Sequence, residues 1–116
     1  MWRVMLKSKI HRATITEANL AYVGSLTVDA NLLREADILP YEMVHIYNIS
    51  NGERFQTYAM EGEAGSGIIC LNGAAARRGA VGDLIIITTY SSYPPEELNH
   101  HTPNIILVDS HNRIQQ

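Results

Sequence analysis

In the stretch "AYVGSLTVD", residues 21–29, Gly24 and Ser25 interrupt a run of aromatic and β-branched residues. Tyr, Val and Thr favour strands, so the run predicts β-structure. A glycine inside a strand gives up side-chain packing and backbone entropy, and it usually marks a bulge, a tight turn or a close backbone approach. The serine adds a nucleophilic oxygen. By these rules alone a bulge or turn is the favoured interpretation of the pair.

Similar apolar runs recur on both sides of this stretch. They are rich in Val, Ile, Thr and Tyr and contain segments of period two, which is typical of strands. The runs are "WRVMLKSKIHRATIT" (2–16), "MVHIYNIS" (43–50), "RFQTYAM" (54–60), "GIICLNG" (67–73), "GDLIIITTY" (82–90) and "NIILVDS" (104–110). Asn51-Gly52 lies between two of them, and this dipeptide predicts a two-stranded hairpin.

Helical patterns are short. "DANLLREAD" (29–37) offers Asp29 as an N-cap and an apolar stripe of Leu32, Leu33 and Ala36, "GAAARRG" (73–79) has room for one or two turns, and "PPEELNH" (94–100) begins with proline at a plausible first helical position. Many short strands with brief helices favour a closed or nearly closed β-barrel. We expect one domain over residues 1–116.

Composition excludes several classes of protein. Apolar residues make up 46% and charged residues 18%, which indicates a globular chain, and the longest apolar runs are too short to cross a bilayer. The start of the chain lacks the apolar core of a signal peptide, so we expect a cytoplasmic protein with no membrane partner. The net charge of −3 and the pI near 5.9 argue against nucleic acid as a partner.

Most generic catalytic patterns are absent. Cys70 is the one cysteine, which excludes an intramolecular disulfide and predicts a buried, inert thiol. Ser66 lacks the glycine two residues before it that a nucleophile elbow requires, and "NGAAARRGAVG" (72–82) lacks the Gly-Lys-Ser/Thr ending of a phosphate loop. We expect no metal site, because the spacing of the remaining candidates favours surface positions: His100, His101 and His111.

Three motifs in a fixed order suggest a family. They are "YVGS" (22–25), "NGERFQTY" (51–58) and "LNGAAA" (71–76). With these motifs, nearly the whole chain resembles the pyruvoyl-dependent aspartate 1-decarboxylases, which make β-alanine from L-aspartate for pantothenate and coenzyme A synthesis. The resemblance implies a small six-stranded double-psi β-barrel, assembled as a homotetramer with active sites between neighbouring subunits.

The resemblance also implies that the bond between Gly24 and Ser25 is cut by the protein itself. The Ser25 hydroxyl would attack the Gly24 carbonyl and form an ester, and β-elimination and hydrolysis would then leave a pyruvoyl group. The products would be a β chain of residues 1–24 and an α chain of residues 25–116. Thr57 matches the family residue that donates a hydrogen bond to the oxyanion of this step, although a threonine there is also an ordinary strand residue. Strain at Gly24 of about 1 to 3 kcal/mol would favour the reaction.

The implied activity is that of a carboxy-lyase. The substrate amine would form a Schiff base with the pyruvoyl ketone, which serves as the electron sink that pyridoxal phosphate provides in other enzymes. Neither a metal nor pyridoxal phosphate is expected. Arg54 and Lys9 would hold the carboxylates of the substrate, and Tyr58 would return the proton, while surface charges and a core aromatic are the structural alternatives.

The resemblance assigns the remaining candidates to substrate contacts and to the pocket wall. Thr57 would also contact the substrate. Asn72 and the backbone of Gly73, Ala74 and Ala75 would hold it, or simply begin a helix. The pocket positions are His11, Tyr22 and Tyr47, and some family members carry Trp at the last of these.

Two other functions stay open from the sequence. A pyruvoyl enzyme could act on glutamate, which is one methylene longer, and this distinction depends on where charges lie around the substrate. Alternatively, the same barrel could be a non-catalytic binding module whose chain stays intact.

Overall fold

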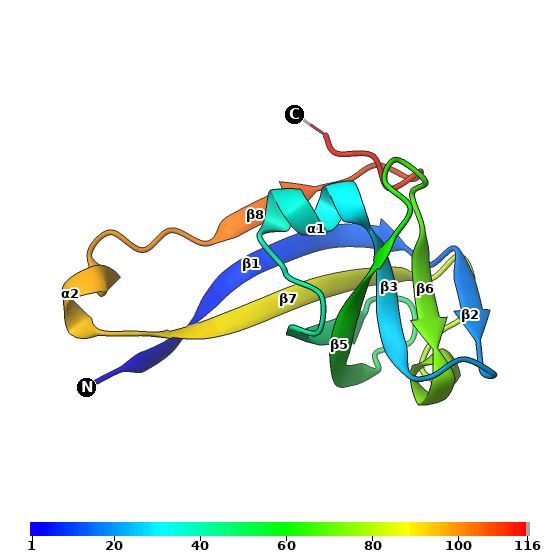
Figure 1. Cartoon of the computed structure of the whole chain (residues 1–116), viewed down its shortest axis with the longest axis horizontal. Helices are drawn as coiled ribbons and strands as arrows, with labels where there is room; N and C mark the ends of the chain where they lie inside the picture. The colour runs from blue at the N-terminus through cyan, green and yellow to red at the C-terminus, as the bar shows by residue number, and fades with distance from the viewer. Residues whose placement is uncertain (116) are drawn as a thin grey trace.

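The computed structural model describes residues 1–115, and it is built mainly of β-strands (Figure 1). In chain order the elements are β1 (Arg3–Thr14), β2 (Glu17–Asn19), β3 (Ser25–Asp29), α1 (Ala30–Ala36), β4 (Met43–Asn48), β5 (Arg54–Gly62), β6 (Ile69–Asn72), the 3₁₀ helix η1 (Gly73–Arg77), β7 (Leu84–Tyr93), α2 (Pro95–Leu98) and β8 (Asn104–Leu107). The mainly-β prediction is confirmed, as are the three short helical segments.

The strands form one continuous order, β2-β6-β3-β5-β4-β7-β1-β8. Three neighbouring pairs are parallel, β2 with β6, β3 with β5 and β1 with β8, and the other pairs are antiparallel. This arrangement is consistent with a small double-psi β-barrel. It contains more than the six expected strands because the short β2 and β8 add to the two ends of the order.

The core forms because alternate residues of each strand point to the same side. Ile10 of β1, Leu26 of β3, Ile46 of β4 and Ile87 of β7 are fully buried in one hydrophobic cluster. The helix α1 covers this cluster with its predicted apolar stripe, Leu32, Leu33 and Ala36. The chain therefore needs no disulfide to hold the strands that carry the site.

Asp29 caps α1 as the sequence predicts, and it also ties down a loop. Its carboxylate accepts hydrogen bonds from the backbone N–H groups of Asn31 at 2.8 Å, Gly65 at 3.0 Å and Gly67 at 2.8 Å. Burial alone would raise the pKa of Asp29, but these donors outweigh it and hold the pKa below its ordinary value. The cap thus fixes the C-terminal end of β3, the strand that begins at Ser25.

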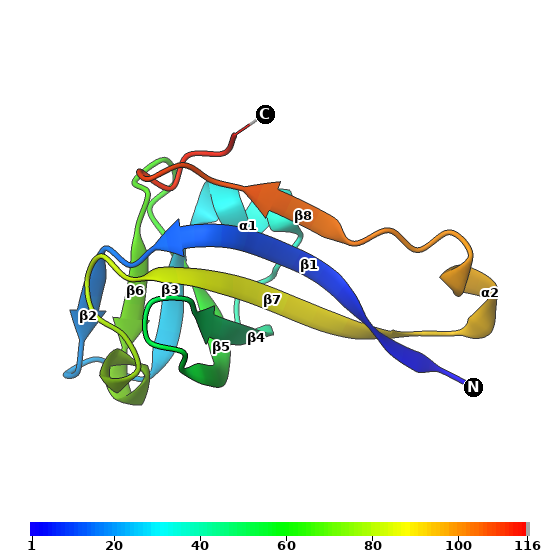
Figure 2. The same ribbon diagram turned by 180° about the vertical axis from the view of Figure 1, so that it is seen from behind.

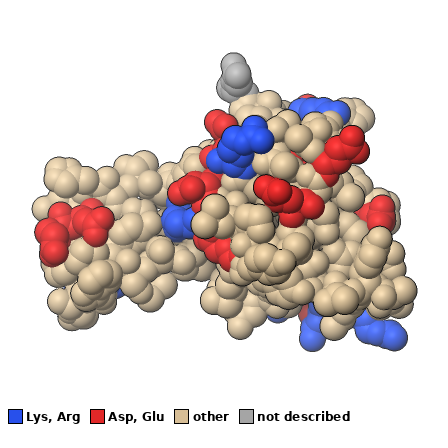
Figure 3. All heavy atoms as spheres, viewed as in Figure 1, with Lys and Arg blue, Asp and Glu red and all other residues tan. Residues whose placement is uncertain are grey.

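β1 and β7 form a long antiparallel ladder from Arg3–Tyr93 to Thr14–Leu84, with two irregularities in register. Figures 1 and 2 show the outer part of this ladder projecting from the rest of the molecule as an arm, with α2 at its tip. In Figure 3 acidic atoms lie at the tip, where α2 carries Glu96 and Glu97, and most of the arm in that view is uncharged. None of the helices within residues 1–115 is long and apolar enough to cross a membrane.

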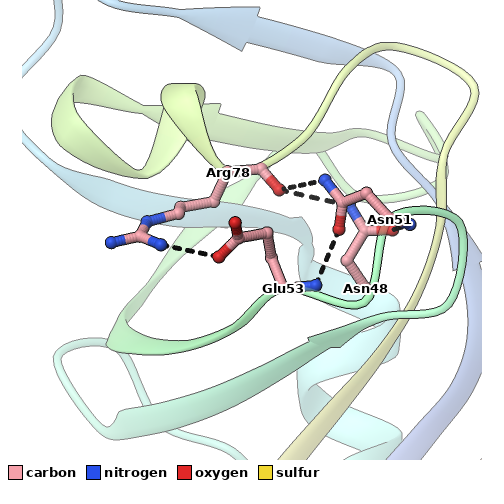
Figure 4. Close-up of polar contacts among 4 residues, drawn as sticks. All are labelled: Asn48, Asn51, Glu53 and Arg78. Atoms are coloured by element: carbon pink, nitrogen blue, oxygen red, sulfur yellow. Dashed lines mark hydrogen bonds and ion pairs between the residues drawn. The ribbon is translucent and has the colours of Figure 1, made fainter.

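The predicted hairpin at Asn51-Gly52 is confirmed as the connection between β4 and β5. Figure 4 shows how this turn holds the segment after η1. The amides of Asn48 and Asn51 donate to the carbonyl of Arg78 at 3.2 and 3.0 Å, and the Arg78 guanidinium donates to Glu53 at 2.6 Å. Because Arg78 is the C-cap of η1, the turn fixes the helix whose first residues adjoin the candidate site.

The strand expected over residues 21–29 begins only at Ser25. Residues 20–24 form a turn, and the Tyr22 and Val23 side chains are 63% and 82% exposed. Strand propensity is wrong here because these side chains find no sheet neighbour to pack against. Gly24 therefore lies at the junction of a loop and a strand, and not inside a strand.

Candidate active site

β3, β5 and β6 direct alternate side chains to one face of the sheet and line a cavity of about 540 Å³. The register pairs Ser25 with Asn72 and Thr27 with Cys70. Tyr58 belongs to the same face of β5. The cavity lining is Glu17, Tyr22, Val23, Ser25, Thr27, Tyr41, Tyr58, Met60, Ile68, Cys70 and Asn72.

Ser25 is the first residue of β3 and is held by a buried amide. Ser25 is 4% exposed, and Asn72, whose side chain contacts it, is 5% exposed. Asn72 Nδ2 donates to Ser25 Oγ at 2.9 Å and to Thr27 Oγ1 at 2.8 Å. The serine oxygen is therefore fixed directly beside its peptide bond to Gly24.

Close packing at this peptide bond depends on Gly73. Its φ is +62°, and a Cβ there would lie 2.8 Å from the N and Cα atoms of Gly24 and 2.9 Å from the Tyr22 carbonyl oxygen. Gly24 has no positive φ, and a Cβ on it would meet only the Asn72 carbonyl oxygen, at 3.8 Å. The expected close approach is present, and the left-handed conformation that glycine adopts readily belongs to Gly73 and not to Gly24.

Thr57 and Tyr58 lie beside the candidate cleavage site in the neighbouring strand. β3 and β5 are parallel, with Leu26 opposite Ala59. Ser25 directly precedes Leu26 and Tyr58 directly precedes Ala59, whereas Gly24 lies in the turn before β3. Tyr58 lines the cavity, and Thr57 belongs to the opposite face of β5 because successive side chains alternate.

Tyr58 also has an aromatic neighbour that the sequence did not single out. The ring of Tyr41 stacks on that of Tyr58, with centroids 6.2 Å apart and an interplanar angle of 24°. Tyr41 has a φ of +72°, a conformation that costs a non-glycine residue energy. The pair forms one wall of the cavity.

Arg54 and Tyr47 form a second cluster outside this cavity. The Arg54 guanidinium lies 4.1 Å from the centroid of the Tyr47 ring, and the Tyr47 hydroxyl is 2.7 Å from that of Tyr90. Burial would raise the pKa of Tyr47, but hydrogen bonds from Tyr90 and Thr88 and the Arg54 charge hold it below its ordinary value, whereas burial raises the pKa of Tyr90. Either of the two hydroxyls can donate to the other.

Lys9 and His11 lie on β1, also outside the cavity that Ser25 lines. His11 lines a separate cavity of about 470 Å³ with Arg12 and Asp109. Burial, followed by the charges of Lys9 and Arg12, lowers the pKa of His11, and its buried Nδ1 has no hydrogen-bond partner within residues 1–115. One chain therefore brings Tyr22, Ser25, Tyr58 and Asn72 together, but not Arg54, Lys9 or His11.

The segment that follows Asn72 forms η1 as a single 3₁₀ stretch. Ala75 is buried and Ala74 is exposed. No group of three or more His, Cys, Asp or Glu side chains in the described part of the chain is placed to hold a metal ion. His101 instead contacts the Leu6 carbonyl oxygen through Nε2, at 2.7 Å.

Several lining residues are not among those predicted from the sequence, above all Glu17, Thr27 and Tyr41, and Cys70 was expected only as a buried thiol. Because side chains alternate along a strand, Ser25 and Thr27 share one face, as do Cys70 and Asn72, so each pair could be predicted within its own strand. The pairing of β3 with β6 was not readable, because the two strands are joined by no local turn signal.

Comparison with known proteins agrees with these observations. The family model described as aspartate decarboxylase matches residues 1–115. A protein of Syntrophobacter fumaroxidans named aspartate 1-decarboxylase is 62% identical over 97% of this chain and 91% of its own length. Proteins of the same name are 53% identical in Desulfotalea psychrophila, over 100% and 98% of the two chains, and 58% identical in Thermoanaerobacter pseudethanolicus, over 97% of each. The chain belongs to the aspartate decarboxylase family.

Proposed function

We propose that this protein is an aspartate 1-decarboxylase, which removes the α-carboxylate of L-aspartate to give β-alanine and carbon dioxide for pantothenate synthesis. The observation that carries the proposal is the buried Ser25 hydroxyl, which is placed directly after Gly24 and held by Asn72 in a cavity of about 540 Å³. The shared name of relatives that match nearly the full chain supports the same activity.

The first step we propose is cleavage of the chain by itself. Ser25 Oγ attacks the Gly24 carbonyl carbon, its proton moves to the Ser25 nitrogen, and the peptide becomes an ester. Loss of the Ser25 α-proton then expels the Gly24 carboxylate, and addition of one water with release of one ammonia leaves a pyruvoyl group on residue 25. Thr57 lies on β5, which pairs with β3 just after the cleavage site, and we assign it the role of donor to the oxyanion.

The cavity suits a pyruvoyl group. A buried amide donor already points at the oxygen of residue 25, and Gly73 leaves room beside the peptide bond. Asn72 and the neighbouring η1 backbone would hold the group. Once formed, it supplies a carbonyl electron sink for decarboxylation, and we assign this chemistry to it without metal or pyridoxal phosphate.

We propose that the substrate is bound by side chains that reach the cavity from outside one subunit. Arg54 presents a planar guanidinium supported by Tyr47, which suits bidentate binding of a carboxylate, and Lys9 adds a second positive charge. Tyr58 lines the cavity with Ser25 and is the candidate proton donor to the carbon that loses its carboxylate. His11 and Tyr22 complete the pocket wall.

A homotetramer with sites between subunits explains why the candidates separate in one chain. Arg54, Lys9 and His11 do not line the Ser25 cavity, so a neighbouring copy would have to supply them. Large apolar side chains that such contacts would cover are exposed, including Trp2, Val4 and Tyr41. We expect the assembly to act in the cytoplasm.

The test is the intact mass of the denatured protein, measured together with aspartate turnover on the same sample. Cleavage after Gly24 would give fragments of 24 and 116 − 24 = 92 residues, the larger one ammonia lighter than a serine-started chain. Ser25→Ala should stay full length and inactive while its circular dichroism spectrum is unchanged. An uncleaved, inactive parent would favour a binding module, and turnover of glutamate in place of aspartate would reassign the substrate.

A further inference from the structure

Cys70 lies two residues before Asn72, the side chain that holds Ser25, and has no role in the chemistry proposed above. It belongs to β6 and is 2% exposed. Its Sγ atom is 3.1 Å from Asn72 Oδ1 and 3.5 Å from Glu17 Oε2. The thiol therefore touches the far end of the amide that holds Ser25.

The contacts of Asn72 with hydroxyl groups do not by themselves decide which way its amide points. The oxygens of Ser25 and Thr27 both accept from Nδ2 as the side chain lies, but hydroxyls also donate. Turning the amide over would place Oδ1 against the two hydroxyls and Nδ2 against Sγ. The group at the other end of the amide therefore decides between the two orientations.

The thiol of Cys70 favours the orientation that is observed, because a protonated thiol has a hydrogen to donate and Oδ1 is its nearer acceptor. Burial, followed by the charge of Glu17, raises the pKa of Cys70 to about 11. The sulfur thus keeps its proton at neutral pH. A thiolate would instead accept from Nδ2 and draw the amide away from Ser25.

We infer that Cys70 is a positioning residue for self-cleavage: its thiol donates to Asn72 Oδ1 and so directs Asn72 Nδ2 onto Ser25 Oγ. This inference rests on the proposed function, in which Ser25 Oγ is the nucleophile. With Nδ2 donating to Oγ, the serine proton points away from Asn72 and the oxygen is held beside Gly24. Without the thiol donor the amide populates both orientations, and Ser25 is held correctly for less of the time.

The experiment follows cleavage of the full chain from the moment of its cell-free synthesis, with intact mass as the readout. Cys70→Ala, which has no donor, should cleave about fivefold more slowly than the parent, the factor expected for one neutral hydrogen bond. Cys70→Ser keeps a donor and should cleave within about twofold of the parent rate. Ile69→Val trims the neighbouring buried residue of β6 and should also match the parent.

Cys70→Val protects the test against a variant that fails to fold, because valine fills the space of the sulfur without a donor. It should be as slow as Cys70→Ala at an unchanged melting temperature. Parent-like cleavage of both donor-free variants would overturn the inference, and so would a Cys70→Ser variant as slow as Cys70→Ala. A parent chain that never cleaves would instead contradict the proposed function, so the two failures are distinguishable.

Discussion

The Gly73→Ala variant tests whether a single hydrogen-to-methyl change at the start of η1 disturbs the cleavage site. At a φ of +62° an alanine costs about 1 to 2 kcal/mol in backbone conformation. Its Cβ would lie 2.8 Å from backbone atoms of Gly24, and relieving that overlap adds about 1 to 3 kcal/mol. The sum is a free energy of unfolding lower by about 2 to 5 kcal/mol, which corresponds to a Tm lower by roughly 8 to 20 °C in a chain of this length.

Gly52→Ala is the matched control, because Gly52 has a φ of +80° with nothing within 4 Å of a Cβ. It should lose only the conformational part, about 1 to 2 kcal/mol, and cleave at the parent rate. Thermal melting followed by circular dichroism measures the first effect, and intact mass during cell-free synthesis measures the second. Gly73→Ala should both melt earlier than Gly52→Ala and cleave more slowly. Equal melting and equal cleavage of the two variants would refute the close-packing argument.

Three further outcomes follow from contacts elsewhere. Asp29→Asn should lower the Tm at pH 7. Because the folded pKa of Asp29 lies below its unfolded value of about 3.9, the difference in Tm between parent and variant should shrink as the pH falls through the folded pKa. A difference in Tm that stays constant from pH 7 to pH 2 would contradict this. Tyr90→Phe removes the hydroxyl that holds Tyr47 beneath Arg54, so the KM for aspartate should rise about three- to tenfold with kcat little changed, as steady-state kinetics would show. Glu53→Gln removes the exposed ion pair of Figure 4 and should change the free energy of unfolding by less than about 1 kcal/mol in urea titrations.

Local signals in the sequence predicted local structure well. The Asn51-Gly52 turn and the Asp29 cap each depend on residues a few positions apart, and both form as expected. The turn at residues 20–24 was mistaken for strand because Tyr22 and Val23 have high β propensity, which a loop exposed to solvent does not use.

The arrangement of the candidate site was beyond such signals. Ser25 and Asn72 are opposite each other only because β3 pairs with β6, and no periodicity within either strand specifies that partner. The resemblance supplied the identities of Ser25, Asn72 and Tyr58, but it did not give the position of Gly73 against Gly24. That contact depends on how closely two backbone segments approach each other. The sequence shows only that a glycine is present, and not which segment lies against it.

The ladder of β1 has a consequence for what a cut after Gly24 would produce. Residues 3–14 pair with β7 on one side, part of the same strand pairs with β8 on the other, and β2 pairs with β6. The severed 24-residue piece would therefore stay bound as a non-covalent subunit. Refolding of the cleaved protein would then require two fragments to associate, so its rate would depend on protein concentration. The uncleaved precursor would refold as one molecule, without the entropy cost of association.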